Sequence, residues 1–164
     1  MLPRRKKMTF IYIGAGLIIA TVALALYYFL FFSRSCNPPL PRETVAIGGA
    51  SFSAEITATM AEKACGLSGR AGLGVGDGMI FPFGSPSVRS FWMKDMEFPL
   101  DIVWIGGGKV LGFAQDAPAP APGTPLWSLK IYTSPDGTDT VLEVPAGTVA
   151  KDNIKVGDTV LIGI

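Results

Sequence analysis

The sequence predicts a mainly β protein: a small antiparallel β-barrel or sandwich with one short helix, preceded by a single N-terminal transmembrane helix. Three observations lead to this prediction. Residues 9–32 (TFIYIGAGLIIATVALALYYFLFF) carry no charge. Apolar and polar residues alternate through residues 52–58, with the period of a half-buried strand. Further short apolar runs follow, separated by glycine-rich turns, and this spacing is typical of a small barrel or sandwich.

The uncharged segment is long enough to span a bilayer, which takes about 20 apolar residues, and exceeds the apolar part of a signal peptide, about 7–15 residues. The basic run at residues 4–7 precedes it, so the positive-inside rule leaves the N-terminus in the cytoplasm. We expect a cytoplasmic basic tail at residues 1–8, a transmembrane helix at 9–32, a Pro-rich linker at 33–43 and an extracytoplasmic domain at 44–164. The localisation predicted is thus the cell membrane, with the lipid bilayer contacted through residues 9–32. The alternative is a cleavable signal that ends before Cys36.

Composition excludes several classes of function. Residues 37–164 contain nine basic and 13 acidic residues, a net charge of −4. An acidic domain argues against nucleic acid as a partner, because binding to phosphates needs a basic face. The sequence has no histidine and only two cysteines, which excludes histidine-based catalysis and histidine-ligated or structural zinc. We expect no metal and no cofactor.

The expected secondary structure follows from local patterns. Thr59 and Glu62 have the spacing of a capping box, and Gly66 is a plausible stop, so a helix of about two turns is predicted between them. Glycines 106–108 suit a hairpin turn, and residues 135–137 form a second turn. The alternating prolines of residues 116–125 favour an extended loop. Strands are expected at residues 52–58, 79–83, 88–93, 100–105, 110–115, 141–144 and 159–163.

Two cysteines in an oxidising compartment raise the question of a disulfide. Cys36 lies in the Pro-rich linker and Cys65 near the end of the predicted helix. Nothing in this spacing brings the two together. We therefore expect separate thiols rather than a bridge, with Cys65 acting as a small buried apolar residue.

The densest segment for function is FWMKDMEFPLDI, residues 91–102. Asp101 opens an apolar run, so its carboxylate is expected to be partly buried and to need a partner. Lys94 lies across the turn that Pro99 imposes and is the obvious partner. The pair is interpreted as a structural ion pair that fixes the turn. The alternative is a pocket in which Lys94 and Asp101 bind a polar ligand or move a proton.

Two further candidates complete a predicted ligand-binding set of Arg70, Lys94, Asp101 and Glu143. Arg70 could clamp a carboxylate or lie solvated on the surface. Glu143 alternates with Leu142 and Val144, so exposure on the outer face of the sheet is expected. The aromatic residues 81, 83, 91, 92 and 98 are expected to form core, the alternative being a stacking platform. No residue is assigned a catalytic role.

Several segments occur in the order found in a known family. They are GLSGR (66–70), GMIFPF (78–83), FWMKD (91–95), PLDI (99–102), LEVPAG (142–147) and IKVGD (154–158). With these strings, residues 45–163 resemble the family called domain of unknown function 192, small bacterial and archaeal domains that are often exported. The family more often has Met at position 68 and Asn-Thr at positions 95–96. The resemblance implies a compact β-rich fold and no known activity.

Three functions fit these observations. We prefer a membrane-anchored extracytoplasmic module that binds a ligand or partner without turnover. The alternatives are an extracytoplasmic enzyme that uses Lys94 and Asp101 for acid–base chemistry on a polar substrate, and a subunit of an envelope complex that grips partners through residues 116–125. A pocket with a strongly perturbed carboxylate would favour the enzyme, and a flat apolar patch would favour the subunit.

Overall fold

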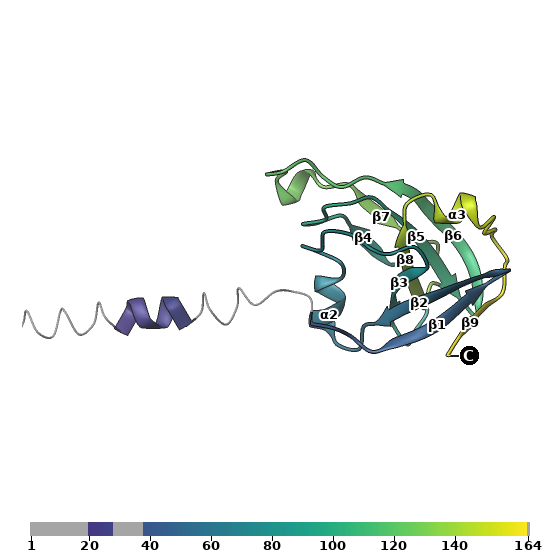
Figure 1. Cartoon of the computed structure of the whole chain (residues 1–164), viewed down its shortest axis with the longest axis horizontal. Coiled ribbons are helices and arrows are strands. Elements are labelled where there is room, and N and C mark those ends of the chain that lie inside the picture. The colour runs from purple at the N-terminus through teal and green to yellow at the C-terminus, as the bar shows by residue number, and fades with distance from the viewer. Residues whose placement is uncertain (1–19, 28–37, 164) are drawn as a thin grey trace, which may run out of the picture. The chain divides into compact units, whose positions relative to one another are not determined.

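The computed structural model describes residues 20–27 and 38–163 (Figure 1). The chain divides into two units, residues 1–35 and 36–164. In the first unit, residues 20–27 are helical. The rest of the predicted transmembrane segment lies outside the described residues, and in the described ranges no helix has the length and apolarity needed to cross a membrane. The transmembrane helix at residues 9–32 stays a prediction.

The second unit is a curled β-sheet with a small second sheet beside it. The large sheet has the strand order β6-β5-β8-β3-β2-β1-β9, and the small one pairs β4 with β7. The strands are β1 (Arg42–Ile47), β2 (Ala50–Ile56), β3 (Asp77–Pro82), β4 (Ser90–Trp92), β5 (Leu100–Gly106), β6 (Lys109–Ala117), β7 (Ile131–Thr133), β8 (Thr140–Pro145) and β9 (Val160–Ile162). The helices are α2 (Met60–Cys65), the 3₁₀ turn η1 (Leu126–Ser128) and α3 (Thr148–Lys151).

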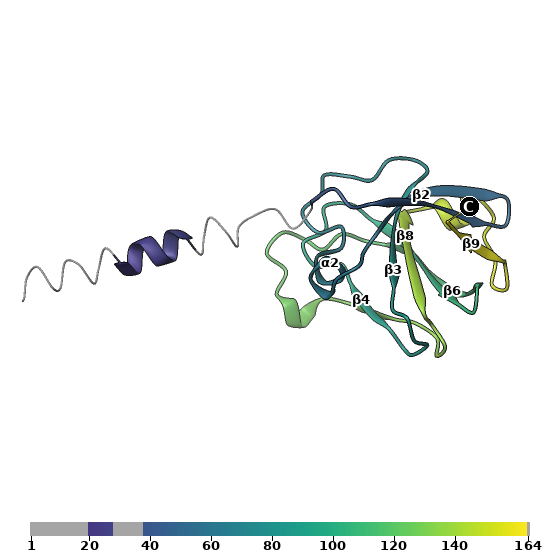
Figure 2. The ribbon, with the colours of Figure 1, turned by 90° about the horizontal axis from the view of Figure 1, so that it is seen from below.

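The large sheet curls until its two edge strands meet at one end (Figures 1 and 2). Lys109 at the start of β6 forms a bridge with Thr159, and the Val160 amide donates to the Gly108 carbonyl at 2.9 Å. The mainly β, barrel-like prediction is therefore confirmed at the level of a half-open barrel. Two details differ. Strands β2 and β3 run parallel, because α2 and the loop after it return the chain to the same edge, and α3 is a second helix too short to leave a periodic pattern.

Both faces of the central strands are covered. The inner face of the curled sheet holds one apolar cluster, which includes Val103, Leu142, Val144 and Val149 of α3. The outer face holds another, formed with Met93 and Tyr132 from the segments around the β4–β7 pair. All seven residues of β5 are buried for this reason. A side chain that points outward from β5, β8 or β3 therefore enters a second core rather than solvent.

Local predictions made from turns and caps are confirmed. The Thr59 hydroxyl accepts the Glu62 amide at 3.2 Å while the Glu62 carboxylate accepts the Thr59 amide at 2.8 Å, and α2 ends at Gly66. Gly107 and Gly108, both with positive φ, turn β5 into β6. Gly106 has no room for a side chain, since a Cβ there would lie 2.2 Å from the Gly137 carbonyl oxygen.

Cys65 is disulfide-bonded, so the expectation of separate thiols is wrong. The sequence contains one other cysteine, Cys36, which lies outside the described residues. Sequence spacing gave no indication of this bridge because the approach of the two segments depends on the tertiary fold. Cys65 is nevertheless buried, as its interpretation as a core residue required.

Candidate ligand-binding site

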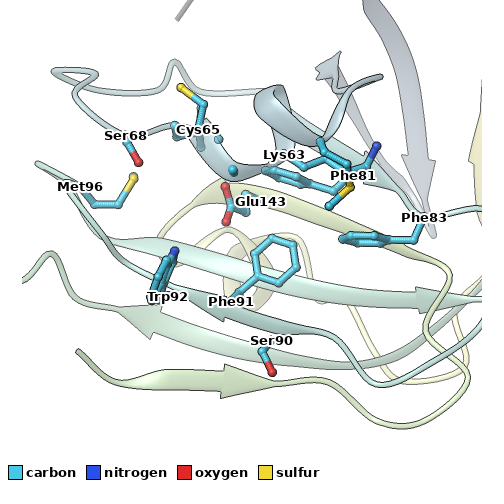
Figure 3. A pocket seen from close by; sticks show the side chains of 14 residues that line it. Lys63, Cys65, Ser68, Phe81, Phe83, Ser90, Phe91, Trp92, Met96 and Glu143 are labelled. Atoms are coloured by element: carbon cyan, nitrogen blue, oxygen red, sulfur yellow. The ribbon is translucent and has the colours of Figure 1, made fainter. Parts of the chain in front are cut away.

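A pocket of about 290 Å³ lies between α2, the segment that follows it, and the aromatic strands β3 and β4 (Figure 3). Its polar floor is the carboxyl group of Glu143 on β8. Apolar and aromatic side chains form most of the rest, as in typical small-molecule sites. The lining residues are Met60, Lys63, Ala64, Cys65, Gly66, Leu67, Ser68, Phe81, Phe83, Ser90, Phe91, Trp92, Met96 and Glu143.

Residues 66–69, which close one side of the pocket, are held by hydrogen bonds to main-chain carbonyls. Gly66 leaves α2 with a φ of +54°, and a Cβ there would lie 3.5 Å from the Phe81 ring. The Ser68 hydroxyl donates to the Lys94 carbonyl at 2.8 Å, and the Gly69 amide donates to the Asp95 carbonyl at 2.7 Å. The two family-specific strings around residues 66–70 and 91–95 are thereby joined at the rim.

Aromatic rings make the opposite wall. Phe91 stands edge-on to Phe81, with ring centroids 5.1 Å apart, and edge-on to Phe83 at 6.2 Å. On its other side Phe91 meets the buried Trp104 at 5.7 Å. Trp92, next in the strand, also lines the pocket and is 46% exposed. Phe81, Phe83 and Phe91 thus serve as core and pocket wall at once, and Phe98 packs on the core without lining this pocket. Trp92 lines the pocket but is exposed, so the expectation that it forms core is wrong.

Glu143 is only 6% exposed, so the expectation that it faces solvent is wrong. Its cross-strand neighbours are Met79 on β3 and Ile102 on β5, both apolar. No hydrogen bond or ion pair reaches its carboxyl group from any part of the chain that the structure describes. Burial raises the pKa of Glu143 from 4.5 to about 8, so the group keeps its proton at neutral pH.

Two cations approach the pocket rim without reaching Glu143. The Lys63 ammonium lies 3.4 Å from the Thr57 carbonyl oxygen and 3.3 Å from that of Ala58, and 5.9 Å from the Phe83 ring centroid. The Arg89 guanidinium stacks over the same ring at 4.2 Å. Both cations therefore interact with the Phe83 ring.

Lys94 and Asp101 do not form the predicted ion pair. Asp101 is fully buried and accepts two backbone hydrogen bonds, from Asp116 of β6 and Val149 of α3, each at 2.8 Å. Lys94 instead contacts the neighbouring Asp95, Nζ to Oδ2 at 2.5 Å, on the surface. The interpretation of a structural pair was wrong in its partner, because two backbone amides satisfy the carboxylate that a cation was expected to neutralise.

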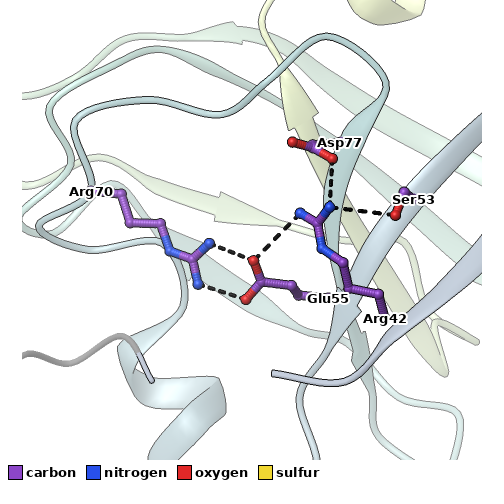
Figure 4. Close-up of polar contacts among 5 residues, drawn as sticks. All are labelled: Arg42, Ser53, Glu55, Arg70 and Asp77. Atoms are coloured by element: carbon purple, nitrogen blue, oxygen red, sulfur yellow. Dashed lines mark hydrogen bonds and ion pairs between the residues drawn. The ribbon is translucent and has the colours of Figure 1, made fainter. Parts of the chain in front are cut away.

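Arg70 binds a carboxylate, but the partner is Glu55 of the same chain rather than a ligand (Figure 4). Its two terminal nitrogens each lie 2.7 Å from an oxygen of Glu55 on β2. Arg42 adds a third contact to Glu55 at 3.5 Å and pairs with Asp77 at 2.8 Å. This network ties the loop after α2 to β1 and β2. Of the four predicted site residues, only Glu143 lines the aromatic pocket.

A second hollow, of about 630 Å³, lies beneath the proline-rich loop. It is bordered by Lys94, Asp95 and Glu97 on one side and residues 119–124 on the other. Lys94 and Asp95 neutralise each other there, and no buried polar group faces the space. Across the described ranges, no three acidic or cysteine side chains gather closely enough to hold a metal ion. The smaller pocket is the better candidate site.

The domain belongs to the DUF192 family, described as an uncharacterized ACR, whose model matches residues 43–162. A protein of unknown function from Novosphingobium aromaticivorans shares 33% sequence identity with a TM-score of 0.66, covering 74% of this chain and 86% of that one. A proposed transcription regulator from Sinorhizobium meliloti shares 25% identity with a TM-score of 0.67, covering 77% and 97%. No curated protein matched the chain.

Proposed function

We propose that the chain is a membrane-anchored extracytoplasmic module that binds a small ligand in the aromatic pocket around Glu143, without turnover. The observation that carries this proposal is the unpartnered Glu143 carboxyl group, buried in a pocket that is otherwise aromatic and apolar. Glu143 opens onto the pocket, and a polar group without a protein partner in an otherwise apolar pocket is a typical point of attachment for a ligand that supplies the partner.

Two features support the location. The uncharged run at residues 9–32 follows four consecutive basic residues, as in a membrane anchor with its N-terminus inside. The disulfide at Cys65 fits an oxidising compartment, where such bonds form and persist. The acidic balance of residues 37–164 gives no support for nucleic-acid binding by this chain.

Acid–base catalysis is the second candidate, because a carboxyl group with a pKa of about 8 can donate a proton at neutral pH. Lys94 and Asp101 do not support it, since they are apart and otherwise bonded. Enzymes of this kind usually combine two titratable groups with different roles. The described lining offers Glu143 and the Lys63 amine, which contacts backbone carbonyls instead. We therefore favour binding.

The test is a small-molecule screen on the full chain in lipid nanodiscs, followed by NMR of tryptophan side chains. Ligands of the pocket should shift the Trp92 indole signal and leave that of Trp127, which is 89% exposed and outside the pocket, unchanged. Trp92→Ala should weaken binding, and Trp127→Ala is the matched control. If fragments of every charge fail to shift Trp92, or shift both indoles alike, the proposal is wrong.

A further inference from the structure

We infer that the ligand of the aromatic pocket is a small organic ammonium ion, an amine on an apolar body whose charged end lies against the Glu143 carboxyl group. This inference rests on the proposed binding function and adds the chemical class of the ligand. Four observations carry it: the aromatic wall, the unpartnered carboxyl, the engagement of the nearby cations, and the charge of the domain.

The wall offers what an ammonium group needs beside the carboxylate. Phe81, Phe91 and Trp92 line the pocket around the Glu143 carboxyl group, which forms its floor (Figure 3). Aromatic faces attract cations, and the attraction grows when water is displaced. A hydrocarbon body is equally suited to these rings and to Met96 and Leu67 on the other sides.

Among the residues that the structure describes, no cation occupies the place that the ligand would take. Of the described lining residues, only Lys63 on α2 and Glu143 itself titrate, because Cys65 is held in a disulfide. The Lys63 amine contacts the Thr57 and Ala58 carbonyls, and Arg89, from the segment before β4, stacks on Phe83. The strands on either side of Glu143 place Met79 and Ile102 opposite it. The carboxyl therefore lacks a charge partner from each of these elements.

The other ligand classes fit less well. An anion would meet a carboxyl floor with no basic group aimed at it, in a domain of net charge −4 that repels it. A neutral alcohol could bond to the protonated carboxyl but would gain nothing from the ring faces as a cation does. A positively charged ligand is favoured by the Glu143 carboxyl group and by the net charge of the domain, and the two cations at the rim, Lys63 and Arg89, already contact backbone carbonyls or the Phe83 ring.

Binding of the ammonium ion should release the Glu143 proton. The ligand enters as R–NH₃⁺, the Glu143 carboxyl gives its proton to solvent, and the resulting carboxylate pairs with the ammonium group. Since burial holds the pKa of free Glu143 at about 8, close to one proton should leave per amine bound at pH 7. Affinity should rise about tenfold for each pH unit between roughly pH 5 and 8.

The experiment is titration calorimetry of the full chain in nanodiscs with three matched probes: phenethylamine, phenethyl alcohol and phenylacetate. We expect the amine to bind at least about tenfold tighter than the alcohol, and phenylacetate not to bind. Titrations in buffers of different ionisation heat measure the proton released. Glu143→Gln keeps the shape of the side chain and should abolish both the preference for the amine and the proton release. Glu97→Gln, an exposed carboxyl outside this pocket, is the control.

The possible outcomes distinguish a wrong ligand class from a wrong binding function. Amine binding that depends on Glu143 and releases a proton supports the inference. Equal binding of amine and alcohol, unchanged in Glu143→Gln, overturns the ligand class and leaves the binding function standing. Absence of binding for all three probes overturns the ligand class too, and fragments that still shift Trp92 would show that the pocket binds something else. Thermal unfolding of Glu143→Gln establishes that the variant is folded, and Glu143→Met provides a second uncharged replacement.

Discussion

Asp101 and Glu143 are two buried carboxyl groups on neighbouring strands of the same sheet, and their surroundings are opposite. Asp101 on β5 points to the side of α3, where two backbone amides donate to it at 2.8 Å. Glu143 on β8 points to the side of α2, where apolar and aromatic side chains surround it and nothing described donates to it. The first carboxylate is part of the fold, and the second has the properties of a site that awaits a partner.

The difference follows from how the two faces are built. Asp101 lies at a register shift between β5 and β6, and the backbone irregularity leaves the Asp116 amide available to it. Its other oxygen accepts the Val149 amide in the first turn of α3, a place where helices leave amides unpaired. Glu143 lies in regular ladder, whose backbone groups are used within the sheet, so only side chains or a ligand can reach it.

Removing the Asp101 carboxylate should have the largest effect on stability. Each hydrogen bond to a charged group contributes about 1.5–3 kcal/mol, and Asp101→Asn turns an amide donor toward one of two backbone donors. We expect a loss of about 3–5 kcal/mol in the free energy of unfolding. Thermal or urea unfolding measures it.

Lys94→Met is the matched control for Asp101, because the two residues were predicted as a pair. The Lys94 ammonium group pairs with the exposed Asp95, and surface pairs contribute about 0–1 kcal/mol. The double variant should show the sum of the two losses. Strong coupling between the substitutions, or a loss in Asp101→Asn no larger than in Lys94→Met, would contradict the structural role assigned to Asp101.

Removing the Glu143 carboxyl should act in the opposite direction. Its folded pKa of about 8 lies above the unfolded value of 4.5, so the stability that the protonated group provides is full below pH 4.5 and lost as pH rises through 8. Each pH unit corresponds to about 1.4 kcal/mol, which gives on the order of 3 kcal/mol between pH 4.5 and 7. Glu143→Gln should be more stable than the natural chain at pH 7 by about that amount.

The measurement is urea unfolding of both chains between pH 4.5 and 8.5. The difference between the two stability curves isolates Glu143 from the other titrating groups, and Glu97→Gln should run parallel to the natural chain. A Glu143→Gln curve that also runs parallel would show that the carboxyl is already satisfied in the folded protein.

The disulfide involves Cys65 at the end of α2, on the same side of the sheet as Glu143. Its loss should destabilise the pocket wall formed by α2 before the rest of the domain. Cross-links of this kind typically contribute about 2–4 kcal/mol. Cys65→Ala and Cys36→Ala should lower stability equally, because Cys36 is the one other cysteine in the sequence. Intact mass after alkylation under non-reducing conditions should show no alkylated cysteine and a mass two protons below that of the dithiol form. Alkylation of both without reductant would contradict the bridge.

The sequence predicted those elements whose signals are local. The capping box at Thr59 and Glu62 and the glycines at the β5–β6 turn each specify their conformation within a few residues, so they were predicted correctly. The sequence did not predict strand β1, whose first residues, Arg42 and Glu43, fall in the expected Pro-rich linker, nor β7, whose three residues leave no pattern. The parallel pairing of β2 and β3 depends on contacts beyond any local signal.

The site was predicted less well, for a related reason. Alternation correctly placed Glu143 on the face opposite Leu142 and Val144, but it could not show that the β4–β7 layer covers that face. The need of Asp101 for a partner was also correct, yet backbone amides carry no sequence signature. The aromatic residues near family-specific strings were the one usable signal for the pocket, and only the fold shows that they surround Glu143.

Glu55 is an intermediate case and carries the smallest expected effect. It is 8% exposed, and the Arg70 guanidinium holds its pKa below the usual value through paired hydrogen bonds (Figure 4). Arg70→Met should lower stability by about 1–3 kcal/mol at pH 7, since it leaves a buried carboxylate with the 3.5 Å contact of Arg42 and a backbone hydrogen bond from Leu40 in place of the paired guanidinium. Arg42→Met, at a site whose side chain is 41% exposed, should lower the stability by less, about 0–1 kcal/mol.

Because the pKa of Glu55 is lowered, the stability that its carboxylate contributes is present above about pH 4.5 and is lost as the pH falls, which is the reverse of Glu143. Unfolding of Arg70→Met at pH 7 and pH 3 measures this: the two chains should converge in acid, and a difference that persists unchanged at pH 3 would show that Arg70 acts by packing rather than by charge.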